Sequence, residues 1–162
     1  MAKKPDSFVS YYNQFKNKIY AYFLYRVGFD VKLAEDLTSE AFMKAFKKFE
    51  DFDEEKPFQP WIYTICRNHL INHYKLSKRE ISLDGIEGLA KYADARVEEK
   101  FELERVIAII NQMDETDKEV LQLRFVQELT NPEIACLLEK EEGAIRTQIS
   151  RSLAKLRELL IK

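Results

Sequence analysis

A short arc of basic and hydroxyl-bearing side chains follows one side of the helix predicted for residues 141–159. The members of this recognition arc are Arg146, Thr147, Ser150, Arg151 and Lys155. The opposite side is an apolar stripe at helical spacing, made of Ile145, Ile149, Leu153, Leu156 and Leu160. Arginine can pair bidentately with guanine in the major groove, and short hydroxyls fit close to bases and phosphates. The arc therefore predicts contact with a nucleic acid.

The helix that carries the recognition arc follows a shorter helix and a tight turn. Residues 130–133 read Thr-Asn-Pro-Glu, which predicts a capping box with proline in the first turn of the shorter helix. A short helix, a turn and a helix with an exposed basic arc form the helix-turn-helix pattern. Ala135 is small where the two helices must approach closely. A plain helical hairpin is the alternative that this pattern leaves open.

Two amide side chains share one face of the helix predicted for residues 60–79. Asn68 and Asn72 are four residues apart, which places them one above the other on a helix. Amides at such positions can read the hydrogen-bonding edge of a base that has left the stack. A surface amide or a cap is the alternative interpretation.

The same helix carries Cys66, His69 and His73, whose spacing could suit a metal ion. A fourth ligand would have to come from elsewhere in the chain, so packing and solvent-facing imidazoles are the preferred interpretation. Cys136 lies far from Cys66 in another predicted helix, which argues against a disulfide. No phosphate loop or acid–base motif occurs, so we expect no metal, no cofactor and no enzyme.

The net charge of −2 conceals two basic segments on either side of an acidic one. Residues 65–79 and 143–157 contain several lysines and arginines and no acid, whereas residues 82–119 are strongly acidic. Two separated basic segments favour a polyanionic partner that is contacted at two places. No stretch approaches the length of a membrane span, and a soluble, cytoplasmic protein is expected.

Helical periodicity predicts an all-α fold made of two small helical domains joined by a linker. The expected helices cover residues 6–27, 30–49, 60–79, 97–112, 116–126, a short helix after Thr130, and 141–159. Aromatic residues concentrate before Tyr74, and residues 80–96 contain two of the four glycines with little periodicity. The predicted organisation is therefore a first domain at 1–80, a linker at 81–96 and a helix-turn-helix domain at 97–162.

Two segments of the first domain and one of the second resemble sigma factors of the extracytoplasmic-function (ECF) group. "AEDLTSEAFMKAFKKF" and "FQPWIYTICRNHLINHYKLSKR" resemble their region 2. "MDETDKEVLQLRFVQELTNPEIACLLEKEEGAIRTQISRSLAKLRELL" is similar to region 4. The resemblance implies an initiation subunit that binds core RNA polymerase and promoter DNA, and for this family an anti-sigma factor is also expected.

The resemblance also implies roles for three sets of residues. The recognition arc would contact the −35 element, with Lys155 at a phosphate or on a plain surface. The −10 element would be contacted by Phe58 and Gln59, which close the loop before the third helix, and by Asn68, Asn72, Lys75 and Arg79. We call the face of the second helix that would bind core polymerase the polymerase-binding set: Asp36, Ser39, Glu40 and Met43.

Three positions depart from the family pattern. Ser39 stands where the family often has glutamine, Asn72 where it often has aspartate, and Glu139 where the turn has glycine. These changes concern promoter preference and the closure of the turn. Two other classes stay open on sequence grounds: a stand-alone helix-turn-helix regulator, and a helical interaction protein that does not touch DNA.

Overall fold

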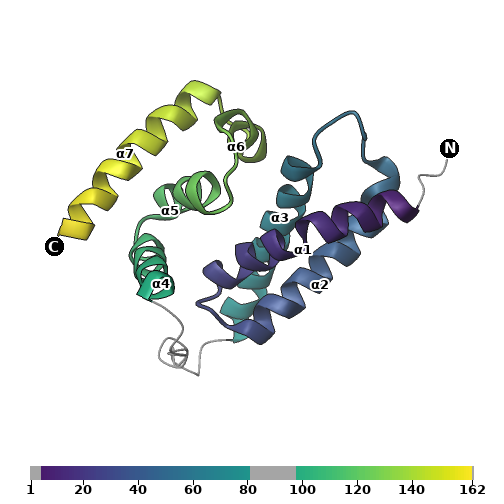
Figure 1. Ribbon diagram of the computed structural model, residues 1–162, viewed down its shortest axis with the longest axis horizontal. Helices are drawn as coiled ribbons and strands as arrows, with labels where there is room; N and C mark the ends of the chain where they lie inside the picture. The colour runs from purple at the N-terminus through teal and green to yellow at the C-terminus, as the bar shows by residue number, and fades with distance from the viewer. Residues whose placement is uncertain (1–4, 81–97, 162) are drawn as a thin grey trace. The chain divides into compact units, whose positions relative to one another are not determined.

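The fold consists of helices over the residues that the computed structural model describes, which are 5–80 and 98–161 (Figure 1). At residues 5, 78–80 and 98–101 the description covers the backbone alone. The chain divides into two compact units, Met1–Tyr92 and Ala93–Lys162. The all-helical fold expected from the sequence is confirmed, and the predicted linker at 81–96 lies outside the described residues.

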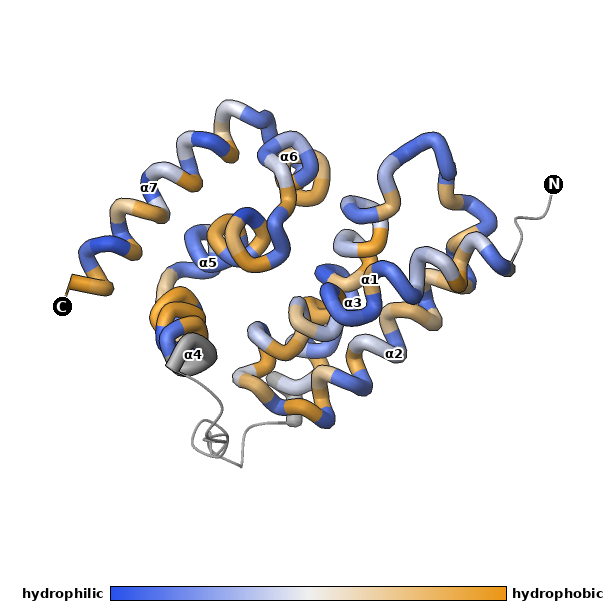
Figure 2. The backbone as a smooth tube through the Cα atoms, viewed as in Figure 1, coloured by the Kyte–Doolittle hydropathy of each residue, from blue (hydrophilic) through white to orange (hydrophobic). Residues whose placement is uncertain are grey.

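The first unit is built from α1 (Pro5–Arg26), α2 (Val31–Lys48) and α3 (Phe58–Glu80), with a 3-10 turn, η1 (Phe49–Asp51), after α2. The side chain of Asp30 caps α2 by accepting a hydrogen bond from the Leu33 amide at 3.1 Å. Both α1 and α3 pack against α2. Figure 2 shows that hydrophobic residues recur along these helices instead of gathering in one stretch, as amphipathic helices require.

Aromatic rings fill much of the core of the first unit. The rings that are buried belong to Phe8, Phe15, Tyr22, Phe23, Phe42, Phe49, Phe52, Phe58 and Tyr63. α3 begins at Phe58, two residues before the predicted start, because the Phe58 ring packs into this core. Pro60 is then in the first turn of α3, where a backbone N–H has no helical partner to lose.

The second unit is built from α4 (Glu98–Asn111), α5 (Glu115–Leu121), a π-helical turn η2 (Gln122–Val126), α6 (Asn131–Leu138) and α7 (Glu142–Ile161). The helix predicted for 116–126 therefore changes its winding at Gln122. The Gln127 amide donates to the Gln122 carbonyl at 2.9 Å, and the buried Gln122 side chain donates to Asn111 Oδ1 at 2.8 Å. These two bonds favour the wider turn.

The helix-turn-helix is formed by α6 and α7. The predicted capping box is confirmed: Thr130 Oγ1 accepts from the Glu133 amide at 3.4 Å, and Glu133 Oε2 accepts from the Thr130 amide at 2.8 Å. The turn closes through Glu139, which has left-handed backbone angles of φ 54° and ψ 47°. This conformation favours glycine, so Glu139 stores strain at the corner of the motif.

Glu139→Gly should stabilise the second unit by about 0.5–1 kcal/mol, because glycine adopts the left-handed conformation without the steric cost that a side chain carries. The free energy of unfolding, measured in urea by circular dichroism, is the readout. Lys140→Gly is the matched control, since this neighbour is not among the positive-φ residues and should lose stability on the same change. A Glu139→Gly protein that is less stable than the parent would contradict the prediction.

Candidate nucleic-acid interface

α7 presents most of the recognition arc to solvent. Arg146, Thr147, Ser150 and Arg151 are exposed, while the apolar stripe of the helix is buried at Ile145, Ile149 and Leu156. Leu160, which the sequence placed in the same stripe, is 38% exposed at the C-terminal end of the helix. The apolar contacts therefore hold the first four turns of α7 so that its arginines face outward.

Two of the arc's side chains make contacts within the first turns of α7. Arg146 Nη2 lies 3.2 Å from Glu142 Oε1, one helical turn earlier, and both side chains are well exposed. Thr147 Oγ1 donates to the Gly143 carbonyl at 3.0 Å. An exposed pair of this kind contributes little to stability, so Arg146 can exchange Glu142 for a base at small cost.

Lys155 differs from the rest of the arc because it is bound to a buried carboxylate. Its Nζ lies 2.8 Å from Oδ2 of Asp117 on α5, a residue that is only 2% exposed. Ser152 Oγ and Gln148 Nε2 donate to Asp117 Oδ1 at 2.6 and 2.7 Å. We call this group the Asp117 network. The Lys155 side chain is nevertheless 55% exposed, so its expected contact with a DNA phosphate stays a prediction.

The Asp117 network shifts the pKa values of its two charged members in opposite directions. Burial by itself would raise the pKa of Asp117, but hydrogen bonds from Lys155 and Ser152, the charge of Lys155 and the Gln148 amide lower it below its usual value. The hydrogen bond and charge of Asp117 raise the pKa of Lys155. Asp117 was not predicted from the sequence. The signal was its spacing, because Asp117 lies three and four residues before Val120 and Leu121 and therefore shares their apolar helix face.

α3 carries exposed polar residues that were predicted to contact the −10 element. Asn68, Asn72 and Lys75 are all exposed, and Gln59 is partly exposed in the first turn. Arg79 lies in the last turn of α3, where its side chain is outside the described residues. The two amides thus share an open face from which a base edge can be reached.

The structure corrects the predicted role of Phe58. Its side chain is 4% exposed, and its ring stacks on Tyr11 with centroids 4.2 Å apart. Trp61, which is partly exposed, packs on Phe58 and Phe52 with centroids 5.4 and 4.7 Å away. Phe58 therefore anchors the start of α3 instead of contacting DNA. Burying its aromatic ring is more favourable than leaving it exposed to solvent in the loop.

The polymerase-binding set is exposed along α2. Met43 is 61% exposed, and with Ser39 it lines a hollow of about 360 Å³. The other residues around this hollow are Phe8, Tyr12, Phe42, Phe46 and Lys47. This side of α2 is therefore more apolar than an acidic, solvated surface, and exposed apolar patches of this kind mark interaction sites.

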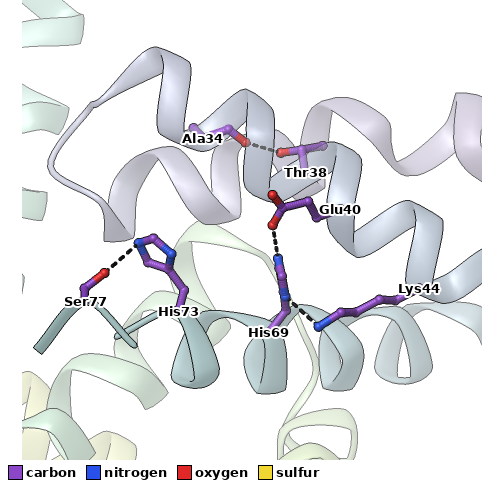
Figure 3. A network of polar contacts seen from close by, with 7 residues as sticks. All are labelled: Ala34, Thr38, Glu40, Lys44, His69, His73 and Ser77. Carbon is purple, nitrogen blue, oxygen red and sulfur yellow. Dashed lines mark hydrogen bonds and ion pairs between the residues drawn. The ribbon is translucent and has the colours of Figure 1, made fainter. Parts of the chain in front are cut away.

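The histidines of α3 are engaged by side chains of the first unit (Figure 3). His69 contacts Glu40 and Lys44 of α2, and His73 contacts Ser77 one turn along α3 at 3.3 Å. Cys66 is fully buried, and burial raises the pKa of its thiol far above the usual range. Within the described ranges, no three His, Cys, Asp or Glu side chains are placed to hold a metal ion.

None of the helices in the described ranges is both long enough and apolar enough to span a membrane.

Comparison with known families finds two matches in the order of the two units. The Sigma-70 region 2 model matches residues 11–80, and the Sigma-70 region 4 model matches residues 103–156. The region 4 match contains α7 as far as residue 156, including the recognition arc, and the region 2 match contains α2 and α3.

Similar proteins and structures extend over nearly the whole chain. The ECF RNA polymerase sigma factor BldN of Streptomyces coelicolor is 33% identical over 98% of this chain, which spans 62% of that relative. The ECF sigma factor SigW of Bacillus subtilis is 29% identical over 96% of this chain and 89% of its own. The Bartonella quintana sigma factor RpoE, solved with the anti-sigma factor NepR, shares the fold: TM-score 0.75, 20% identity, and coverage of 95% of this chain and 96% of RpoE.

The two helical units and their matches therefore define a sigma factor of the sigma-70 type. Within that class, the chain belongs to the ECF group of the sigma-70 family.

Proposed function

We propose that this chain binds core RNA polymerase, directs it to specific promoters and helps to open the −10 region. The observation that carries the proposal is the match of sigma regions 2 and 4 to residues 11–80 and 103–156. The exposed chemistry of each unit supports it. α7 offers arginines and hydroxyls, and α3 offers two amides and a lysine, all of which suit DNA.

The roles of single residues are inferred from the resemblance to sigma regions 2 and 4, and the exposure and charge of the side chains support them. Arg146, Thr147, Ser150 and Arg151 contact the −35 element, and the Asp117 network fixes the rotation of α7 that presents them. Asn68, Asn72 and Lys75, with Gln59 near the start of α3, contact the −10 element. The polymerase-binding set and the hollow beside it form the contact with core polymerase.

We further infer that the chain acts in the cytoplasm and is regulated by an anti-sigma factor. RpoE was solved with the anti-sigma factor NepR, and CnrH was solved with the cytosolic domain of CnrY. These complexes support the existence of such a partner for this chain. A pull-down from a lysate of the native host would identify it.

Gel filtration with purified core RNA polymerase tests the proposal directly. A sigma factor should co-elute with core polymerase at one to one and should then support run-off transcription from genomic fragments. A stand-alone regulator should elute separately from core polymerase. Salt-sensitive promoter binding of the assembled enzyme excludes an interaction protein that does not touch DNA.

The double change Asn68→Ala and Asn72→Ala should reduce open-complex formation by about 30-fold or more, because each lost contact with a base edge is worth about 1–3 kcal/mol and two contacts are lost. Permanganate reactivity of −10 thymines measures opening. Asn13→Ala with Asn17→Ala is the matched control, since these are exposed amides on α1. Normal opening with both α3 amides removed, at unchanged core binding, would place base capture elsewhere.

A further inference from the structure

His69 connects α3 to both other helices of the first unit at one point. Its side chain is 11% exposed, and its ring meets Phe23 of α1 edge-on with centroids 6.4 Å apart. Its two ring nitrogens contact α2: Nε2 lies 2.7 Å from Glu40 Oε2, and Nδ1 lies 2.8 Å from Lys44 Nζ (Figure 3). His69 is thus held between a carboxylate and an ammonium.

These partners decide which ring nitrogen carries the proton. An ammonium can only donate hydrogen bonds, so Nδ1 of His69 must accept one from Lys44. The ring proton is then on Nε2, which donates it to the Glu40 carboxylate. Lys44, His69 and Glu40 therefore form a directed chain of hydrogen bonds, whereas a proton on Nδ1 would point at the Lys44 ammonium.

This chain restricts two long side chains on the exposed face of α2. The Glu40 side chain is 55% exposed, yet one of its oxygens is fixed by His69. A free glutamate or lysine loses rotamer freedom when a partner binds it, and a side chain that is already held loses less. The bonds made by His69 therefore lower the entropic cost of any contact made through Glu40.

We propose that His69 is a positioning residue for polymerase binding, which holds Glu40 from the helix that carries Asn68 and Asn72. The inference rests on the proposed function, in which Glu40 belongs to the polymerase-binding set. It makes α3 serve both surfaces: its exposed amides face the −10 strand, and its inward histidine orders the helix that meets core polymerase. Neither the family matches nor the roles argued above assign this task to His69.

The test is the affinity of the whole 162-residue chain for core RNA polymerase, measured by fluorescence anisotropy. His69→Leu keeps the apolar bulk but removes both nitrogens, and affinity should fall about tenfold. His69→Gln should stay within about threefold of the parent, because an amide can both donate and accept. His73→Gln is the matched control on the same helix, since His73 contacts Ser77 instead of α2, and it should leave affinity unchanged.

A double-mutant cycle separates positioning from a merely structural role. In a Glu40→Ala background the further change His69→Leu should cost less than about twofold in affinity. An equal loss in both backgrounds, or no loss in either, would overturn the proposal. If circular dichroism shows that His69→Leu is unfolded, His69→Asn replaces it in the cycle, because its short amide does not span to α2.

The same measurements distinguish failure of the inference from failure of the proposed function. If Glu40→Ala binds core polymerase as the parent does, Glu40 does not contribute to polymerase binding and the inference about His69 is wrong. The proposed sigma activity is unaffected by that result. If the parent protein itself fails to bind core polymerase, the proposed function is wrong.

Discussion

Arg146→Ala and Arg151→Ala should each weaken binding to the −35 element by about 1–3 kcal/mol, which is a loss of roughly 5- to 150-fold. Both guanidinium groups are exposed on α7, and the ion pair of Arg146 with Glu142 is itself exposed, so Arg146 can leave it at small cost when it binds a base. A bidentate contact with guanine carries specificity, so each change should also relax the choice of base at one position. Selection from a −35 library by the reconstituted polymerase measures both effects.

Arg157→Ala is the control for the arginine changes. Arg157 is exposed on the same helix but outside the recognition arc, and its removal should weaken binding equally across the library or leave it unchanged. If polymerase with Arg146→Ala or Arg151→Ala keeps the preference of the parent across all −35 sequences, α7 does not read these bases.

Asp117→Ala should destabilise the second unit by about 2–3 kcal/mol, because the buried Ser152 hydroxyl and the Gln148 amide lose their acceptor. Removing the acceptor costs more than the net strength of the bonds, since the Ser152 hydroxyl is buried away from water. Urea unfolding followed by circular dichroism measures the change. Trp61, the single tryptophan, lies in the first unit, and its fluorescence transition should stay where it is.

The contribution of Asp117 should also depend on pH. Its pKa is lowered in the folded state, so the unfolded chain binds its proton first as the pH falls. The stabilisation is then complete above the ordinary carboxyl pKa of about 4 and is lost as the pH drops through the lower folded value. The difference in unfolding free energy between the parent and Asp117→Asn should therefore be constant near neutral pH and shrink in acid.

Asp114→Asn supplies the control for the pH series. Asp114 precedes α5, is exposed, and makes no capping hydrogen bond with its side chain. Its replacement should change stability by less than about 0.5 kcal/mol at any pH. A parent and an Asp117→Asn protein that lose stability in parallel down to pH 2 would show that the network does not hold a charged carboxylate.

Local pattern was sufficient to place most of the helices and the helix-turn-helix. A helix is specified by neighbours three and four residues apart, so the periodicity of α1, α2 and α7 is visible in the sequence itself. The capping box at Thr130 and Glu133 is local for the same reason. The exposed faces that carry Arg151, Asn68 and Asn72 follow from the same periodicity, because a polar residue opposite an apolar stripe must face solvent.

Tertiary packing decided which of the polar and aromatic residues are free to act. Lys155 and Asp117 are 38 residues apart, and Glu40 and His69 are 29 residues apart, so no helical period connects either pair. The sequence places Phe58 in the loop before α3, whereas in the structure its ring packs against the rings of Tyr11 and Trp61. The sequence shows Glu139 where the turn usually has glycine, and the structure shows that this residue closes the turn in the left-handed conformation. The sequence by itself determined where the helices run and which faces they expose, whereas the partners of Lys155, Phe58 and His69 depend on which distant surfaces the core brings together.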